Sequence, residues 1–212
     1  INKKEIIINI ISFLLLISIL LSFLIVKNFD TNFLLNTILI SSALYLFLIT
    51  LRDFFIKKYN NLSQNIAHFG FSLLILSIIF NNLFSTEIIT NLKVGETFKS
   101  ETTKIVFEGI NQKKEKNYQS IIGNFSIQNS KGKIENMSPE LRIYNQPNIV
   151  TSEADIKTTL ISDTFIVINL VQNQDYFNVR YQVKPFMIWI WISVVLISFG
   201  GLISFIKKKY EK

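Results

Sequence analysis

The stretch YFNVRYQVKPFMIWIWISVVLISFGGLISFI, residues 176–206, joins the two patterns that decide the fold. Over residues 176–183 apolar and polar residues alternate, as in a strand with one buried face. The apolar members of that face are Phe177, Val179, Tyr181 and Val183. Residues 186–206 then contain no Asp, Glu, Lys or Arg, and their number suits a bilayer, whose ~30 Å core needs about 20 helical residues. The stretch therefore predicts a strand that leads directly into a membrane-spanning helix.

Three similar uncharged runs precede it, at residues 6–26, 33–51 and 66–84, in a chain that is 49% hydrophobic. We therefore predict a membrane α+β protein with four transmembrane helices and an extracytoplasmic antiparallel β sandwich or barrel-like domain. The predicted parts are three helices within 1–84 (6–26, 33–51 and 63–84), a periplasmic β-rich domain at 85–184, a fourth helix at 185–206 and a basic cytoplasmic tail at 207–212.

Short alternating segments fill the region between the third and fourth runs. Ile121, Gly123, Phe125 and Ile127 share one predicted strand face. Further strands are predicted at 103–110 and 164–171, with a turn at 129–132 and a hairpin loop at 172–175. One short helical piece is predicted near residues 152–158.

The net charge of +7 is unevenly placed. Nine basic and three acidic residues flank the ends of the runs on one side of the alternating topology, whereas the charges of the other side nearly cancel. The positive-inside rule makes that basic side cytoplasmic, so both termini are expected inside. The charge excess therefore indicates contact with membrane lipid and not with nucleic acid. Cysteine is absent, which excludes disulfides and thiolate chemistry from this chain.

His68 is the only histidine, and it lies about six residues, or ~9 Å, inside the third predicted helix at 63–84. Apolar surroundings favour the neutral imidazole, whose free lone pair is what a haem iron binds. The small neighbours Ala67 and Gly70 leave room for a flat macrocycle or for another helix. The alternative is a histidine that only hydrogen-bonds to an adjacent helix. One histidine cannot supply two axial ligands.

Other candidates have simpler interpretations. Trp189 and Trp191 lie where an aromatic belt is expected at the outer interface, and their spacing puts them on different helix faces. Gly200 and Gly201 favour close helix packing. A phosphate-binding glycine loop, a catalytic carboxylate pair and a Ser/His/Asp set are not apparent, so hydrolysis has no support.

Several segments together resemble the C-terminal part of the CcmF/NrfE family, the haem lyase subunit of cytochrome c maturation. They are AHFG (67–70), LKVGE (92–96), FEGI (107–110), NY (117–118), PELRIY (139–144), TSEADI (151–156) and KPFMIWIW (184–191). The resemblance covers about residues 63–212, in order. Arg142, Tyr144 and Glu153 match motif positions to which the family gives no firm role.

The resemblance implies that His68 is an axial ligand of a haem b that takes electrons from quinol. That haem would reduce the haem delivered by the chaperone CcmE, for attachment to apocytochrome c held by CcmH. It implies a bacterial or mitochondrial inner membrane and a periplasmic docking domain. The family's Trp-rich tract, its outer histidines and the second haem b ligand are absent from these residues. We therefore expect the rest of CcmF as a partner. Since the sequence begins at Ile1 and not at an initiator Met, that partner is either the preceding part of a longer chain or a separate subunit. We expect no haem lyase activity from this chain alone. The alternative is a cofactor-free, membrane-anchored periplasmic assembly protein.

Overall fold

The computed structural model describes residues 3–25, 33–56, 62–100, 102–129, 132–171 and 175–210. It divides into two compact units, a helical unit formed by Ile1–Leu83 and Phe186–Lys212 and a β domain formed by Phe84–Pro185, and each is described by itself. The sequence also predicts connections at 27–32 and 52–61; residues 27–32 and 57–61 lie outside the described residues, as do part of the turn at 129–132, part of the loop at 172–175 and the last two residues of the basic tail.

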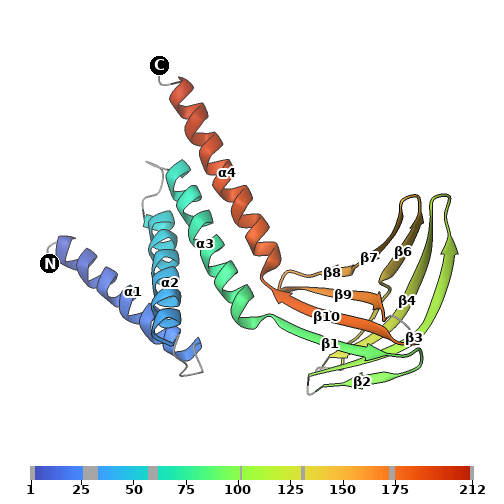
Figure 1. Cartoon of the computed structure of the whole chain (residues 1–212). Helices are drawn as coiled ribbons and strands as arrows, with labels where there is room; N and C mark the ends of the chain where they lie inside the picture. Colours follow the sequence, from blue (N-terminus) through green and yellow to red (C-terminus); the bar gives the residue numbers. More distant parts are fainter. Residues whose placement is uncertain are drawn as a thin grey trace. The chain divides into compact units, whose positions relative to one another are not determined.

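The helical unit contains α1 (Lys3–Ile25), α2 (Phe33–Ile56), α3 (Leu62–Phe84) and α4 (Met187–Tyr210) (Figure 1). Three of these helices hold stretches long and apolar enough to cross a membrane: Thr37–Phe54, Leu62–Phe84 and Met187–Lys207. The described apolar stretch of α1, Ile6–Ser22, is shorter, so the span predicted at 6–26 stays a prediction.

Small polar side chains join the helices of this unit. Ser18 of α1 and Ser22 of α1 are fully buried, and the Ser18 hydroxyl lies 3.4 Å from that of Ser41 in α2. Each buried hydroxyl also donates to a carbonyl of its own helix, Ser18 to Leu15 at 2.7 Å and Ser22 to Ile19 at 2.7 Å. Because these groups are satisfied locally, they allow close helix packing without an unpaired polar atom in an apolar layer.

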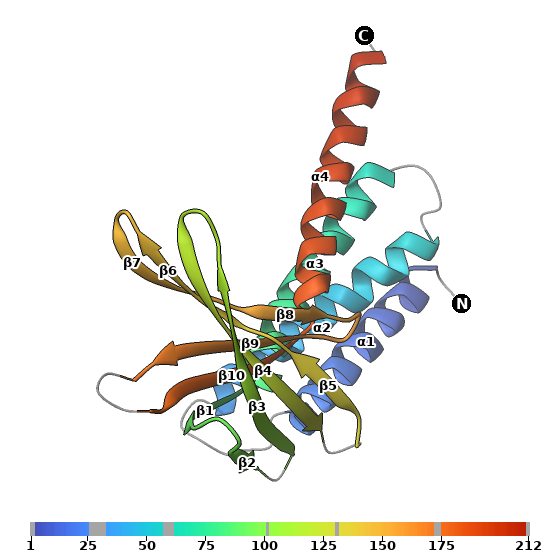
Figure 2. The ribbon, with the colours of Figure 1, turned by 90° about the vertical axis from the view of Figure 1, so that its right-hand side faces the viewer.

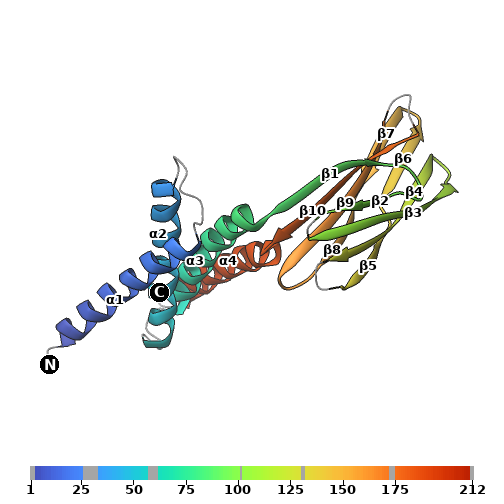
Figure 3. The same ribbon diagram turned by 90° about the horizontal axis from the view of Figure 1, so that it is seen from below.

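The β domain is a sandwich of two antiparallel sheets (Figures 2 and 3). The first sheet has the order β1-β10-β9-β8, and the second has the order β2-β3-β4-β6-β7 with β5 also paired to β4. The strand bounds are β1 (Thr86–Leu92), β2 (Thr97–Lys99), β3 (Thr103–Lys114), β4 (Tyr118–Asn129), β5 (Ile134–Met137), β6 (Glu140–Asn145), β7 (Asn148–Glu153), β8 (Asp155–Thr158), β9 (Ser162–Leu170) and β10 (Phe177–Pro185).

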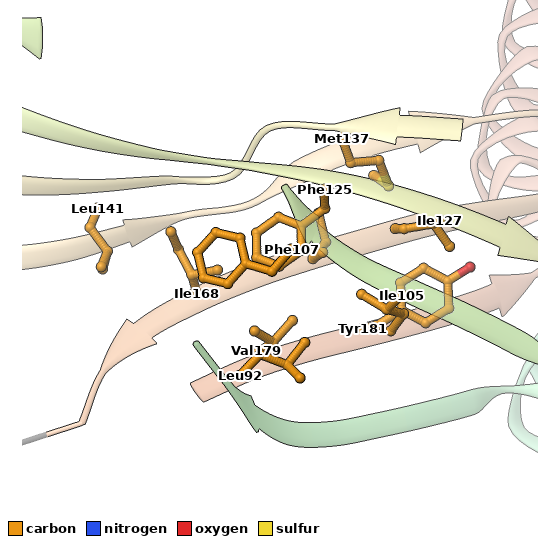
Figure 4. Packing of buried hydrophobic residues seen from close by; sticks show 11 residues of the cluster. Leu92, Ile105, Phe107, Phe125, Ile127, Met137, Leu141, Ile168, Val179 and Tyr181 are labelled. Atoms are coloured by element: carbon orange, nitrogen blue, oxygen red, sulfur yellow. The ribbon is translucent and has the colours of Figure 1, made fainter. Parts of the chain in front are cut away.

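Aromatic and aliphatic side chains from the inner faces of both sheets form the core (Figure 4). The Phe107 and Phe125 rings stack with centroids 4.3 Å apart, and Phe177 meets Phe107 edge-on at 5.5 Å. The two predicted strand faces are confirmed, since Val179 and Tyr181 are buried and Phe125 and Ile127 lie beside them in the core. Alternation in the sequence therefore identified the inner faces correctly.

The helix predicted near residues 152–158 is wrong. That segment forms the end of β7 and all of β8, which pair with β6 and β9. Ile149, Val150 and Ile156 supply strand-favouring side chains there, and the ladder partners override the weak local helical signal.

Candidate functional site

Helix α3 carries His68, and the packing of α3 determines which face the histidine occupies. One face lies against α2. The Phe69 and Phe47 ring centroids are 5.5 Å apart, and the hydroxyls of Ser72 and Thr50 lie 2.9 Å apart. The buried residues Leu76, Ile40, Ala43 and Leu44 continue this contact.

A second face of α3 lies against α4 through residues without large side chains. A Cβ placed on Gly70 would lie 3.0 Å from the backbone nitrogen of Ile197, and one placed on Gly200 would lie 2.8 Å from the backbone nitrogen of Ala67. Ala67 and Gly70 therefore serve helix packing, which is one of the two uses that the sequence left open for them. The predicted packing role is confirmed for Gly200 but not for Gly201, around which a Cβ would meet nothing within 4 Å.

His68 lies on the third face of α3, which neither α2 nor α4 covers. Exposed residues recur there at helical spacing: Gln64, His68, Phe71 and Ile78. Phe71, about one turn from His68, is 52% exposed, and Ile78, about 15 Å further along the helix axis than His68, is 51% exposed, so the face is apolar on that side of the imidazole. Within the part of the chain that the structure describes, no hydrogen bond involves His68, and its side chain is exposed.

This face has the chemistry that a haem axial ligand needs. An exposed imidazole supplies one nitrogen donor, and the phenyl ring of Phe71 about one turn away suits the flat apolar surface of a porphyrin. Among the described residues, no group of three or more His, Cys, Asp or Glu could hold a metal ion. Because the sequence has no other histidine, a haem with two imidazole ligands would need its second ligand from residues beyond this sequence. The residues present therefore fit one half of a bis-imidazole haem site.

The two tryptophans of α4 behave as their spacing predicted. Trp191 is 65% exposed whereas Trp189 is partly buried, so the two indoles do lie on different faces. The two indoles therefore cannot both contact one ligand. Trp191 has the exposure expected of an indole in an aromatic belt.

The structure brings the three motif residues of the β domain together on the outer face of the second sheet. Arg142 Nε donates to Glu140 at 2.7 Å, and Arg142 Nη1 lies 3.7 Å from a carboxylate oxygen of Glu153. The guanidinium also lies 5.2 Å from the centre of the Tyr118 ring, which lies 5.3 Å from the Tyr144 ring. The hydrogen bond to Glu140 is the main reason why the pKa of Arg142 is raised.

This cluster joins three strands. Tyr118 pairs with Tyr144 between β4 and β6, and Arg142 pairs with Thr151 between β6 and β7. The side chains are half-buried and satisfied by one another, which indicates that they stabilise the sheet. The sequence identified Arg142, Tyr144 and Glu153 but not their partners Glu140 and Tyr118, whose positions follow only from the strand register.

Residues 83–185 match the family model described as the CcmF C-terminal beta-sandwich. The chain is 27% identical over 148 residues to the cytochrome c-type biogenesis protein CcmF of Pseudomonas fluorescens, covering 70% of this chain and 22% of that protein. It is 29% identical over 148 residues to the CcmF of Haemophilus influenzae, covering 69% of this chain and 22% of that protein. The chain thus spans about a fifth of the length of these relatives.

A cytochrome c-type biogenesis protein NrfE of Haemophilus influenzae is 21% identical over 178 residues, covering 82% of this chain and 28% of that protein. The solved structure of a cytochrome c haem lyase CcmF shares the fold with a TM-score of 0.67 at 14% identity, covering 92% of this chain and 33% of that chain. The apolar helices and these relatives make the protein an integral membrane protein. With its β-sandwich matched over 83–185, the chain corresponds to the C-terminal part of proteins of the CcmF family.

Proposed function

We propose that the chain is the C-terminal portion of a haem lyase subunit in cytochrome c maturation, with His68 as an axial ligand of haem b. The observation that carries this proposal is the likeness over 92% of the chain to a solved cytochrome c haem lyase CcmF, combined with the single imidazole on the uncovered face of α3. The curated relatives, all named cytochrome c-type biogenesis proteins, support the same reaction class.

The role of the chain is to hold one imidazole at a fixed rotation. Contacts with α2 through Ser72 and with α4 through Gly70 prevent α3 from turning about its axis, so His68 keeps the uncovered face. A nitrogen held in this way would bind a haem iron without the side-chain and helix reorientation that a mobile ligand would need. When bound, haem b supplies one-electron transfer, here between a quinol and the haem that is to be attached.

The partners follow from the resemblance to the family. The β domain is proposed to be the periplasmic part that docks the chaperone CcmE, CcmH or apocytochrome c, with four spans and both termini in the cytoplasm. The basic residues gathered at one side of the predicted spans support this orientation. The rest of CcmF, supplied by the same or another polypeptide, completes the site.

Haem attachment in cells tests this function. Cells in which the chromosomal copy is replaced by His68→Ala should lose covalent haem on their c-type cytochromes, measured by haem staining of denatured proteins. Gln64→Ala, one turn away on the same face, is the matched control and should keep attachment. The cofactor-free alternative predicts normal attachment in both strains, and that result would remove His68 from the reaction.

A further inference from the structure

The turn between β8 and β9 carries the two most exposed large apolar side chains of the described β domain. Leu160 is 69% exposed and Ile161 is 72% exposed. Tight turns ordinarily carry Gly, Asn, Asp or Ser, because glycine adopts positive φ and the polar side chains hydrogen-bond to the backbone of the turn. A Leu-Ile pair at such a tip therefore needs an explanation beyond turn formation.

Three backbone N–H groups of this turn, those of Thr159, Ile161 and Ser162, are paired within the turn itself. The Thr159 N–H donates to the Ser162 carbonyl at 3.0 Å, and the Thr159 hydroxyl donates to the same carbonyl at 2.8 Å. The Thr159 hydroxyl oxygen in turn accepts from the N–H groups of Ser162 at 3.0 Å and Ile161 at 3.3 Å. Because these three donors are already paired, the turn can enter a region poor in water at lower cost than a turn whose N–H groups all depend on solvent.

Strand register places the turn at one particular end of its sheet. Ser162, the first residue of β9, pairs with Pro185, the last residue of β10, and Thr86, the first residue of β1, pairs with Val183 of the same strand. Only Phe186 separates Pro185 from α4, and only Ser85 separates α3 from Thr86. The chain therefore enters and leaves the membrane-spanning stretches at the sheet end that carries the turn.

The lengths involved are short. A strand rises about 3.3 Å per residue, and Leu160 and Ile161 lie one residue beyond the pair of Ser162 and Pro185, so the turn backbone extends about 3 Å beyond the level of Pro185. The span Met187–Lys207 begins two residues after that proline. Lys184, one residue before the proline, lies with its Nζ 5.8 Å from the centre of the Phe165 ring at the same end of the sheet. A basic side chain beside apolar ones is the usual composition at a lipid headgroup layer.

We propose that the β8–β9 turn inserts Leu160 and Ile161 into the outer surface of the bilayer that the helices of this chain span. The turn is thus a third point of attachment for the β domain, beside the two chain connections. The two connections and the turn follow one another along one edge of the sheet β1-β10-β9-β8, so the turn lengthens the line along which the domain meets the membrane and keeps the far part of that edge from lifting away. This inference does not depend on haem binding or on haem lyase activity.

The absence of cysteine from the chain allows a clean test with single nitroxide labels. The full chain is reconstituted in nanodiscs that contain phosphatidylcholine and phosphatidylglycerol, with the label at Leu160→Cys or Ile161→Cys. The matched control is Leu170→Cys, because Leu170 is an exposed leucine at the other end of β9. Collision rates with oxygen, which concentrates in lipid, and with a neutral nickel chelate, which stays in water, are measured by electron paramagnetic resonance.

We expect the ratio of oxygen to nickel accessibility to be several-fold higher at 160 and 161 than at 170. Equal ratios at the three positions would show that the turn lies in water and would overturn the proposal. Protection of 160 and 161 from both reagents would show that protein covers the turn, and this would also overturn it. His68→Ala should leave all three ratios unchanged, which separates this inference from the proposed function.

Discussion

Gly200 of α4 lies directly against Ala67 of α3, so that a Cβ at position 200 would lie 2.8 Å from the Ala67 nitrogen and 2.8 Å from the Ser63 carbonyl oxygen. Both neighbours are backbone atoms, which cannot rotate away. Ala67 is the residue before His68, so this contact positions the part of α3 that carries the imidazole.

Gly200→Ala should lower the stability of the helical unit. The added methyl group must push α4 away from α3, and overpacking of this kind costs about 1–3 kcal/mol. A lower thermal unfolding midpoint of the full chain in detergent is the expected result. Gly201→Ala is the matched control, since a Cβ there meets nothing within 4 Å, and its midpoint should stay the same or rise slightly. Equal losses in both variants would contradict the close α3–α4 contact.

The hydroxyl contact between Thr50 and Ser72 should couple α2 to α3. A double-mutant cycle with Thr50→Val and Ser72→Ala should give a coupling energy of about 0.6 kcal/mol, which is the average for hydrogen bonds between membrane helices. The cycle is measured by unfolding of the full chain in mixed micelles of increasing denaturing-detergent content. A coupling energy of zero would mean that the two hydroxyls, 2.9 Å apart, bond only to their own helices.

Gly123→Ala should destabilise the β domain. A Cβ at this position of β4 would lie 2.8 Å from Phe125 Cε2 and 3.2 Å from Ile168 Cδ1, within the core around the stacked Phe107 and Phe125 rings. We expect a loss of about 1–3 kcal/mol in the free energy of unfolding, since the ring is held by its stack and cannot move freely. Gly109→Ala, beside the irregularity in β3 where a Cβ meets nothing, is the control and should change stability by less than about 0.5 kcal/mol.

The ionised carboxylate of Glu87 should stabilise the β domain, and this stabilisation should be lost in acid. The hydrogen bond from Arg180 lowers the pKa of the Glu87 carboxyl below its ordinary value of 4.5. A carboxyl whose pKa is lower in the folded state stabilises the fold above its unfolded pKa, and this contribution is lost as the pH falls through the folded value. Below about pH 4.5, the temperature at which half of the protein is unfolded should therefore fall less steeply with decreasing pH in Glu87→Gln than in the parent chain. Parallel pH profiles would show that the Glu87–Arg180 pair does not contribute.

The sequence predicted those elements whose signal is local. Alternation in the segments around Phe125 and Val179 gave both strands and their inner faces, because side-chain direction in a strand depends only on position along it. The segment from Ile149 to Thr158 could not be read in this way. Its strands β7 and β8 are short and largely exposed, and they exist because β6 and β9 offer ladder partners to them.

The candidate site was predictable in its residue but not in its surroundings. A lone histidine inside an apolar run is recognisable as a candidate from the sequence, because ionisable residues are rare in membrane spans. Which face of α3 it occupies depends on where α2 and α4 pack, and the small residues Ala67 and Gly70 fitted a macrocycle or a helix equally well in the sequence. The structure resolves that choice in favour of α4 and leaves the His68 face uncovered.

Absorption spectroscopy of the purified, complete membrane complex tests most directly whether His68 binds haem iron. The reduced-minus-oxidised spectrum of the parent complex should show the α band of a low-spin, bis-imidazole haem b. His68→Ala should abolish that band while Gln64→Ala and Gly201→Ala retain it, with equal amounts of folded protein in each sample. A haem b band of full height in the His68→Ala complex would contradict the account.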